Sequence, residues 1–406
     1  MSGDANDTSQ LSRVLIVTHH SAGLEAPQVG YLAEFLSCSQ WAVDLLGPID
    51  EAYRPPGLRI LRVGHGRSRN VVLLLLGLWM CATRRYDLVI GLDEAGTAVA
   101  LVAKCLGLKA RVALYFLDLF LDIEGSRFTR LGRRMLRLRG KKADVIIDTN
   151  EERSEFRREF VGDGPVYAVL HNAPPRSQQQ TRSCGGLPQT ENQEEGLRLI
   201  YTGSVHVAAC LDQVIRALAQ VQIPIRLSVV GWGTEEHVKK LKALATACNC
   251  SDRIVFVGPV PRERLAAIAA SADAGLALYP CSEAAPLNER LCSPNKVYEY
   301  MAAGLPVITN NSPSMVSLVQ KKGWGLCVPP NEPSAIAAAV EQLGRNPRLR
   351  RIMSARAVEL HKTCMNFQYQ ADQLLPLLLG FQRQTTKEPG CDRGDRGCPP
   401  LLVRKL

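Results

Sequence analysis

Residues 293–308 read SPNKVYEYMAAGLPVI and are the most informative stretch of the chain. Ser293 has a hydroxyl that can cap a helix, and Pro294 suits a first helical turn, which has no N–H partner to lose. We expect a helix of about three turns that ends at Gly304, since glycine readily adopts the left-handed conformation of a helix C-terminus. Pro306 cannot continue the helix, and the residues after it are typical of a short buried strand.

The start of this predicted helix is a candidate anion site. A helix N-terminus presents N–H groups and a partial positive charge, and Lys296 adds an ammonium group. Glu299 follows on the same face, with its side chain directed back towards the helix start. There it can accept hydrogen bonds from two vicinal hydroxyls while Lys296 holds phosphate. We interpret this as a grip on a nucleoside diphosphate; the alternative is an ordinary surface helix with one Lys–Glu pair.

Composition and charge limit the function classes. With 406 residues and 46% hydrophobic content, the chain is long enough for two domains, each with its own core. The thirteen cysteines are scattered singly through apolar segments, which favours reduced thiols in a cytosolic protein. Cys248 and Cys250 have the wrong spacing for a zinc knuckle, so no structural metal is expected. The net charge of +10 favours an anionic partner, and the absence of a nucleic-acid motif indicates lipid or phosphate.

Three segments of the chain bear on membrane association. The N-terminal residues lack the basic and apolar regions of a signal peptide. The longest apolar run, residues 71–82, is shorter than the roughly 20 residues that span a bilayer, so we expect a buried helix. An interfacial helix is the alternative, because Arg67, Arg69, Arg84 and Arg85 flank the run.

Residues 127–142 also bear on membrane association. They carry eight Lys or Arg residues, which alternate with apolar residues at helix-like spacing. A basic amphipathic helix of this kind predicts peripheral contact with an anionic membrane. A solvated basic face, or a contact with an anionic acceptor, is the alternative.

The first half alternates apolar runs with helical patterns. Strands are predicted at 13–18, 41–46, 58–63, 88–90, 110–115 and 145–147. This order predicts a doubly wound parallel sheet, in which ligands bind beyond the carboxyl ends of the strands. That rule selects a set of candidate polar or loop residues: His19, His20, Gly23, Asp93, Glu94, Asp118 and Asn150.

A polar segment rich in Gln, Gly and Pro, residues 174–196, has the composition of a linker. A second alternating series follows, with strands predicted at 197–201, 226–230, 254–257 and 273–279. Its loops at Gly203 and Gly231 are expected at the same sheet edge as the helix after Ser293, where small residues let a backbone approach phosphate closely. The single GxG at 231–233 is not a dinucleotide fingerprint.

The stretch 293–308 resembles the nucleotide-sugar helix of the GT-B glycosyltransferases of family 4 (group 1), which act with retention of configuration. Residues 86–91 (YDLVIG) and 171–174 (HNAP) are similar to that family's strand and domain-closing motifs, and VVGWG resembles its VVGxG turn. The resemblance covers 197–378 well and 13–174 loosely. It implies two Rossmann-like doubly wound parallel-sheet domains that face a cleft.

The resemblance also implies domain bounds. The acceptor-side domain would span 1–173 and, beyond the linker at 174–196, the nucleotide-sugar domain would span 197–366. A helix at 367–381 would cross back to the first domain, and 382–406 would form a mobile tail.

The site residues implied by the resemblance divide between the two domains. Lys296 would stabilise the diphosphate leaving group and Glu299 would bind the ribose hydroxyls. Asp118, and His19 or His20, would face the sugar and the acceptor; for Asp118 the alternative is a structural cap of the next helix. The remaining donor contacts would come from Gly203, Ser204, Gly231, Gly233, Val260, Ser293 and Asn295.

The chain departs from the family pattern at two points. Leu291 stands where the first of two family glutamates is usual, although Asn288 fits a subgroup that lacks this glutamate. After Gly203, His206 is the one candidate base where relatives have Arg and Lys. No Asp-x-Asp metal motif is present, which agrees with metal-independent chemistry and no cofactor beyond the donor.

The leading hypothesis is a retaining, metal-independent glycosyltransferase at the cytoplasmic membrane face. It would move a sugar from a nucleoside-diphosphate sugar to a sugar or lipid-linked acceptor in cell-surface polysaccharide or glycolipid synthesis. One alternative is an inactive glycosyltransferase-like scaffold subunit, which the departure at Leu291 motivates. Another is a nucleotide-sugar epimerase on the same fold. The sequence does not reveal the sugar, the base or the acceptor.

Overall fold

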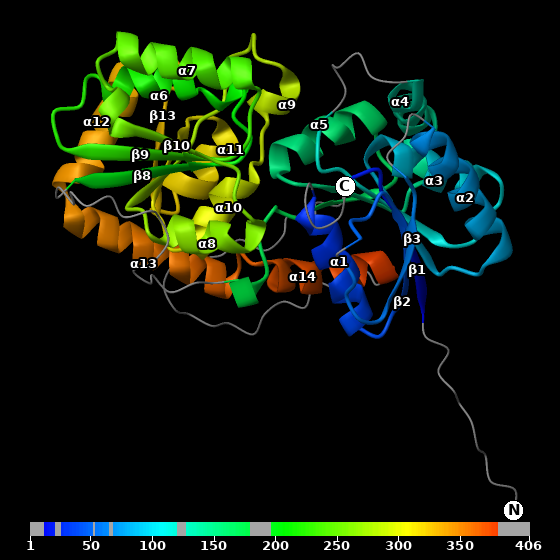
Figure 1. The fold of residues 1–406 in the computed structure, drawn as a ribbon. Coiled ribbons are helices and arrows are strands. Elements are labelled where there is room, and N and C mark those ends of the chain that lie inside the picture. The colour runs from blue at the N-terminus through cyan, green and yellow to red at the C-terminus, as the bar shows by residue number, and fades with distance from the viewer. Residues whose placement is uncertain are drawn as a thin grey trace, which may run out of the picture. The chain divides into compact units, whose positions relative to one another are not determined.

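The computed structural model describes residues 12–20, 26–51, 53–64, 68–119, 127–178 and 196–380. It divides into two compact units (Figure 1), one formed by 1–170 with 371–406 and the other by 171–370. Most of the predicted linker, the predicted tail at 382–406 and Gly23 lie outside the described residues. No helix in the described ranges has the length and hydropathy of a membrane span.

The first unit is built on a seven-stranded parallel sheet in the order β3-β2-β1-β4-β5-β6-β7. Leu45 and Ile90 flank Ile16 on the neighbouring strands, and all three side chains are buried. The six predicted strands are confirmed within one or two residues at most ends, and β7 was not predicted. The strands are β1 (Arg13–Val17), β2 (Ala42–Gly47), β3 (Leu58–Arg62), β4 (Leu88–Leu92), β5 (Arg111–Tyr115), β6 (Val145–Asp148) and β7 (Val166–Val169).

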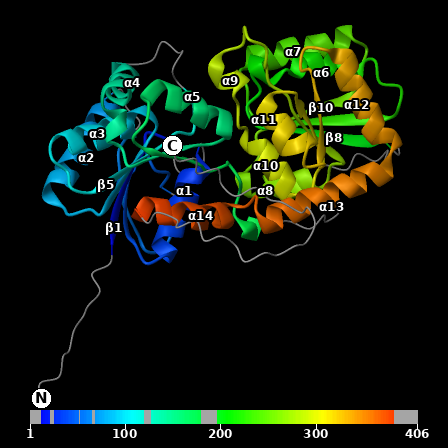
Figure 2. The same ribbon diagram turned by 180° about the vertical axis from the view of Figure 1, so that it is seen from behind.

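Helices cover both faces of this sheet (Figure 2). They are α1 (Pro27–Cys38), α2 (Arg69–Thr83), α3 (Asp93–Cys105), α4 (Arg127–Arg139), α5 (Glu151–Val161) and the end of α14 (Phe367–Leu379). In α14, residues from Ala371 onwards belong to the first unit, and Arg111 donates to the carbonyls of Leu377 and Leu378. The expectation of a buried helix at 71–82 was wrong, because only one side of α2 is buried.

The second unit has a six-stranded parallel sheet in the order β10-β9-β8-β11-β12-β13. Its strands are β8 (Leu197–Thr202), β9 (Ile225–Val230), β10 (Ile254–Gly258), β11 (Ala274–Ala277), β12 (Val307–Asn310) and the unpredicted β13 (Gly325–Val328). Its main helices are α6 (Leu211–Leu218), α7 (Glu235–Ala247), α8 (Arg262–Ala270), α9 (Leu287–Arg290), α10 (Asn295–Ala302), α12 (Pro333–Arg345) and α13 (Pro347–Thr363).

Both units therefore confirm the predicted class of two Rossmann-like parallel-sheet domains. In each sheet the order of strands reverses beside the first strand of its series, β1 or β8. Ligands of such sheets bind beyond the carboxyl ends of the strands near this reversal. In the second unit that edge carries the loops after β8, β9 and β11.

Candidate functional site

The N-terminus of α10 is held by groups from elsewhere in the second unit. The carbonyl of Ser293 accepts a 2.7 Å hydrogen bond from the Asn172 amide, and Nδ1 of His171 lies 3.2 Å from the Tyr298 hydroxyl. The predicted Ser293 cap was wrong: Pro294 occupies the cap position without a side-chain hydrogen bond, and the Ser293 hydroxyl lies 3.2 Å from that of Tyr298.

The C-terminus of α10 matches the sequence pattern more closely. The helix ends at Ala302, and Gly304 has a φ of +64°, as the left-handed cap requires. The N–H of Leu305 donates to the carbonyl of Tyr300 at 2.8 Å, which closes the last turn before Pro306. The helix is thus shorter than predicted, and its start is where the charged side chain of interest lies.

Lys296 is buried in the second unit, with 7% of its surface exposed. Its Nζ lies 3.8 Å from the centre of the Tyr201 ring and 5.3 Å from that of Tyr279. Burial lowers the pKa of Lys296 to about 7, against the opposing influence of Glu299 and Cys292. An ammonium in such a place is stabilised by ring faces, and it would be stabilised much further by an anion.

The glycine loops after β8 and β9 pack against each other, and the loop after β8 also packs against Lys296. Gly203 has a φ of +113°, and a Cβ there would stand 3.4 Å from Nζ of Lys296. Gly231 has a φ of +151°, and a Cβ there would fall 1.8 Å from the carbonyl oxygen of Gly203. Any side chain at Gly231 would therefore push the two loops apart. Beyond them, Gly233 forms a parallel bridge with Val205.

The other predicted donor residues lie on α10 and on the loops after β8 and β10. The carbonyl of Ser204 accepts a 2.5 Å hydrogen bond from the Tyr201 hydroxyl. Asn295 is the first residue of α10, and Glu299 is half-buried one turn later. Val260 follows Gly258, whose carbonyl accepts the N–H of Gly231 at 2.9 Å. The structure thus brings Gly203 into contact with both Gly231 and Lys296, and Val260 follows β10, two strands away at the edge of the sheet.

Sequence reasoning missed the tyrosines of this site. Tyr201 and Tyr279 follow the apolar runs of β8 and β11, where an aromatic residue is typical of ordinary core. Tyr300 accepts the N–H of Thr202 at 2.9 Å and so fixes the end of β8 against α10. Partial burial, Lys296 and His237 lower the pKa of His206, so this base lies within electrostatic reach of Lys296. The one available signal was position: Tyr201 and Tyr279 lie at the carboxyl ends of their strands.

In the first unit, Asp93 is the centre of a second cluster. Its carboxylate is fully buried, lies 2.6 Å from Nε2 of His20 and accepts the N–H groups of Leu117 and Asp118. Burial alone would raise the pKa of Asp93, but His20, His19 and the Asp118 N–H together hold it below its ordinary value. Asp93 has a φ of +47°, in the left-handed region that Asp and Asn adopt more readily than other residues with a side chain.

The same cluster has donor atoms in a geometry that a metal could use. His19, His20 and Asp93 each offer one ligand atom, and these atoms lie within 4.8 Å of one another. The 2.6 Å separation between His20 and Asp93 is a hydrogen-bond distance, so this pair is satisfied by itself. The sequence predicted no metal, and that expectation stays a prediction.

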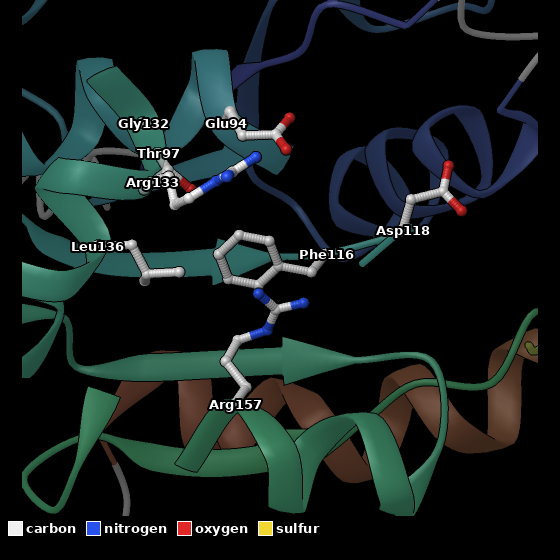
Figure 3. Close-up of a pocket in the computed structure, with 8 residues that line it drawn as sticks. All are labelled: Glu94, Thr97, Phe116, Asp118, Gly132, Arg133, Leu136 and Arg157. Atoms are coloured by element: carbon white, nitrogen blue, oxygen red, sulfur yellow. The ribbon is translucent and has the colours of Figure 1, made fainter. Parts of the chain in front are cut away.

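Asp118 lies beside a small pocket of the first unit (Figure 3), lined by Glu94, Thr97, Phe116, Asp118, Gly132, Arg133, Leu136 and Arg157. The guanidinium of Arg157 lies 3.5 Å from the centre of the Phe116 ring and donates from Nε to Asp148 at 2.8 Å. Burial and the nearby Asp93 raise the pKa of Glu94 to about 7. In Figure 3 the carboxylate of Asp118 is directed away from Phe116, at one side of the pocket.

Comparison with known proteins agrees with the resemblance found in the sequence. Residues 188–359 match the family model described as Glycosyl transferases group 1. This match confirms the resemblance to group 1 enzymes, and the narrower family 4 stays a prediction. A search of curated proteins finds no match to this chain.

Solved structures with the same fold cover nearly the whole chain. Sucrose-phosphate synthase from Thermosynechococcus elongatus has a TM-score of 0.72 at 19% sequence identity, over 92% of this chain and 100% of that chain. HepE of Anabaena, in complex with UDP and glucose, has a TM-score of 0.73 at 14% identity, over 91% of this chain and 100% of that chain. WaaG, a glycosyltransferase involved in lipopolysaccharide biosynthesis, has a TM-score of 0.63 at 16% identity, over 91% of this chain and 100% of that chain. At these identities the likeness shows the fold.

Proposed function

We propose that this chain, which combines a region matching the group 1 glycosyltransferase model with the same fold as solved glycosyltransferases, transfers a sugar from a nucleoside-diphosphate sugar to an acceptor hydroxyl with retention of configuration. The observation that carries this proposal is the buried Lys296 at the start of α10, against the Gly203 loop. HepE binds UDP and glucose in a chain of the same fold, which makes uracil the first donor base to test.

Lys296 is the proposed stabiliser of the leaving group. Breaking the bond between sugar and diphosphate leaves negative charge on the diphosphate oxygens, and a preorganised cation in a dry site stabilises that charge strongly. The N–H groups at the start of α10 and the backbone around Gly203 would complete the phosphate contacts. This charge balance supports chemistry without a divalent cation.

Glu299 is the proposed partner of the ribose. It stands one turn after Lys296 on α10, and its charge already acts on the Lys296 ammonium. A carboxylate can accept two hydrogen bonds from the vicinal hydroxyls of a ribose, which a deoxyribose cannot supply. The donor would thus be oriented by the Lys296 ammonium at its diphosphate and by the Glu299 carboxylate at its ribose.

The acceptor is proposed to bind through the first unit. Asp118 and His19 lie at the carboxyl edge of its sheet, with the paired His20 and Asp93 beside them. Polar groups in this position suit the hydroxyls of a sugar, free or lipid-linked. Synthesis of cell-surface polysaccharide or glycolipid is the proposed setting.

Donor binding can be tested with a thermal-shift panel of nucleoside-diphosphate sugars, because a bound donor raises the melting temperature by mass action. We expect one base to stabilise the protein and Lys296→Met to weaken that donor roughly 10- to 100-fold. Lys321→Met is the matched control, since Lys321 is an exposed lysine of the same unit. Equal donor affinity in both variants would contradict the assignment of Lys296.

Turnover separates the enzyme from its alternatives. Release of nucleoside diphosphate that requires an acceptor supports transfer, and NMR of the new glycosidic bond reports retention or inversion. Donor binding without any turnover would support a scaffold subunit. A free isomerised sugar without acceptor would support an epimerase.

A further inference from the structure

The outer side of α2 is apolar along its length. One side of the helix buries Leu73, Gly77 and Met80 in the core of the first unit. The opposite side exposes Leu75 by 64% and Trp79 by 54%, with Val71 and Val72 beside them. Arg69 is the only charged residue of α2. An apolar side this wide is unusual on a surface helix, whose outer face is normally polar.

The large hydrophobic side chains exposed in the described residues are concentrated here. There are ten of them, of which α2 contributes four and α4, on the other side of α3, contributes Leu138. Half of the set therefore lies on two helices of one unit. Scattered single residues need no explanation, but a group on helices of one face of a domain marks an interaction surface.

The helix α4 supplies positive charge on the same side of the first unit. It contains no acidic residue, and Arg134, Arg137 and Arg139 are exposed on it. The sequence suggested that residues 127–142 alone would form an amphipathic membrane helix. In the structure the apolar residues Met135 and Leu136 pack into the core of the first unit, so α4 offers mainly its basic side.

Both helices cover the same face of the first sheet. Leu73 and Met80 of α2 share one core cluster with Leu136 of α4, and α3 packs against both helices. Figures 1 and 2 show α2, α3 and α4 in a row on that face, with α3 between the other two. Their solvent-facing sides are therefore directed away from the same sheet. We call the exposed residues of α2 and α4 the outer surface.

We propose that the outer surface docks the protein on an anionic lipid bilayer. Trp79 and Leu75 would enter the interface between head groups and acyl chains, where tryptophan is favoured. The arginines of α4 would bind the lipid phosphates and gain from the negative surface potential. A second copy of the chain fits less well, because a two-fold interface would bring the basic helices of both copies together. The proposal needs no donor or acceptor, so it stands apart from the proposed function.

Vesicle flotation of the full chain tests this proposal. We expect binding to vesicles of phosphatidylcholine with phosphatidylglycerol, little binding to phosphatidylcholine alone, and release by salt. The double variant Leu75→Glu with Trp79→Glu should lower the bound fraction at least about tenfold. Ile352→Glu is the control, because Ile352 is 56% exposed on α13 of the second unit and so is not part of the outer surface.

Three outcomes would overturn the proposal: no binding to either vesicle, equal binding to both, or equal loss in Ile352→Glu. A shift in sedimentation for the double variant alone, without lipid binding by the unchanged protein, would instead assign the surface to self-association. An unchanged melting temperature and donor affinity in the double variant would show that it is folded and that the donor site is intact.

Depth can be measured in a Trp232→Phe background, which removes the exposed tryptophan of the second unit and leaves Trp41 and Trp324 buried. Brominated lipids should then quench the fluorescence of Trp79, and a protein bound through charge alone would show no quenching. Quenching that persists in Trp79→Phe would contradict the insertion of this residue.

Discussion

Lys296 lies over the ring of Tyr201, with Nζ 3.8 Å from its centre. The two side chains come from α10 and β8, which are far apart in the sequence and adjacent at the carboxyl edge of the second sheet. The ring replaces some of the hydration that burial removes, but burial still lowers the pKa of Lys296 to about 7. This one contact makes the charge of the proposed donor site dependent on pH.

Donor affinity should fall as the pH rises above 7. The ammonium form binds diphosphate, and its fraction in the free protein decreases above the pKa of about 7. If only this form binds, the dissociation constant should rise by about tenfold for each pH unit above the pKa, as long as Lys296 stays protonated in the donor complex. Calorimetry in buffers of different ionisation enthalpy should show proton uptake on binding near pH 8. Pure pH independence between neutral and alkaline solution would contradict the lowered pKa.

Replacement of Lys296 by Met should stabilise the unliganded protein. The pKa of Lys296 is lower in the fold than in the unfolded chain, so its burial destabilises the fold most below pH 7. That penalty is relieved progressively as the pH rises from 7 towards the ordinary lysine pKa. We expect Lys296→Met to raise the free energy of unfolding by about 1–3 kcal/mol at pH 6 and by less at pH 9. Urea unfolding at both pH values measures this, with Lys321→Met unchanged.

Gly231→Ala should destabilise the second unit far more than Gly258→Ala. Both glycines have positive φ angles at the same sheet edge, of +151° and +82°. A Cβ at Gly231 would lie 1.8 Å from a carbonyl oxygen, whereas at Gly258 nothing lies within 4 Å. We expect a loss of about 3 kcal/mol for the first and about 1 kcal/mol for the second. Comparable losses of stability in thermal or urea unfolding would show that the positive φ, and not the steric clash at Gly231, determines the cost of both substitutions.

Asp93→Asn should cost stability at neutral pH and little in acid. Asparagine keeps the shape and tolerates the positive φ, but it loses the charge that His20 contacts at 2.6 Å. Because the pKa of Asp93 is lowered in the fold, its contribution is present above the unfolded pKa and lost as the pH falls through the folded value. We expect a loss of about 1–3 kcal/mol at pH 7. The exposed Asp163→Asn serves as the control, and an equal loss there would count against the ion pair.

Glycosyl transfer should persist in EDTA, since Lys296 and the start of α10 are proposed to neutralise the leaving group. Activity with and without chelator, at matched donor concentration, measures this. A loss that magnesium or manganese restores would contradict the proposed chemistry. A loss restored by zinc and altered by His20→Ala would instead assign a metal to His19, His20 and Asp93.

Much of the fold was predictable because buried parallel strands appear as continuous apolar runs. β7 and β13 escaped this pattern: VYAV and GLCV are only four residues long, and the second begins with glycine. The apolar run at 71–82 was recognised as a helix, but its exposure was not. A continuous apolar run does not reveal which side of a helix meets the core, because both sides have the same composition.

The sequence by itself determined the local features of the donor helix: the Pro294 start, the Gly304 end, and Lys296 and Glu299 one turn apart. These depend on backbone preferences that neighbouring residues set. Only the tertiary structure decided that Tyr298 binds the Ser293 hydroxyl, that Gly203 admits Lys296, and that Tyr201 covers its ammonium. Burial and charge depend on atoms from distant segments, so the lowered pKa of Lys296 is a consequence of the tertiary structure.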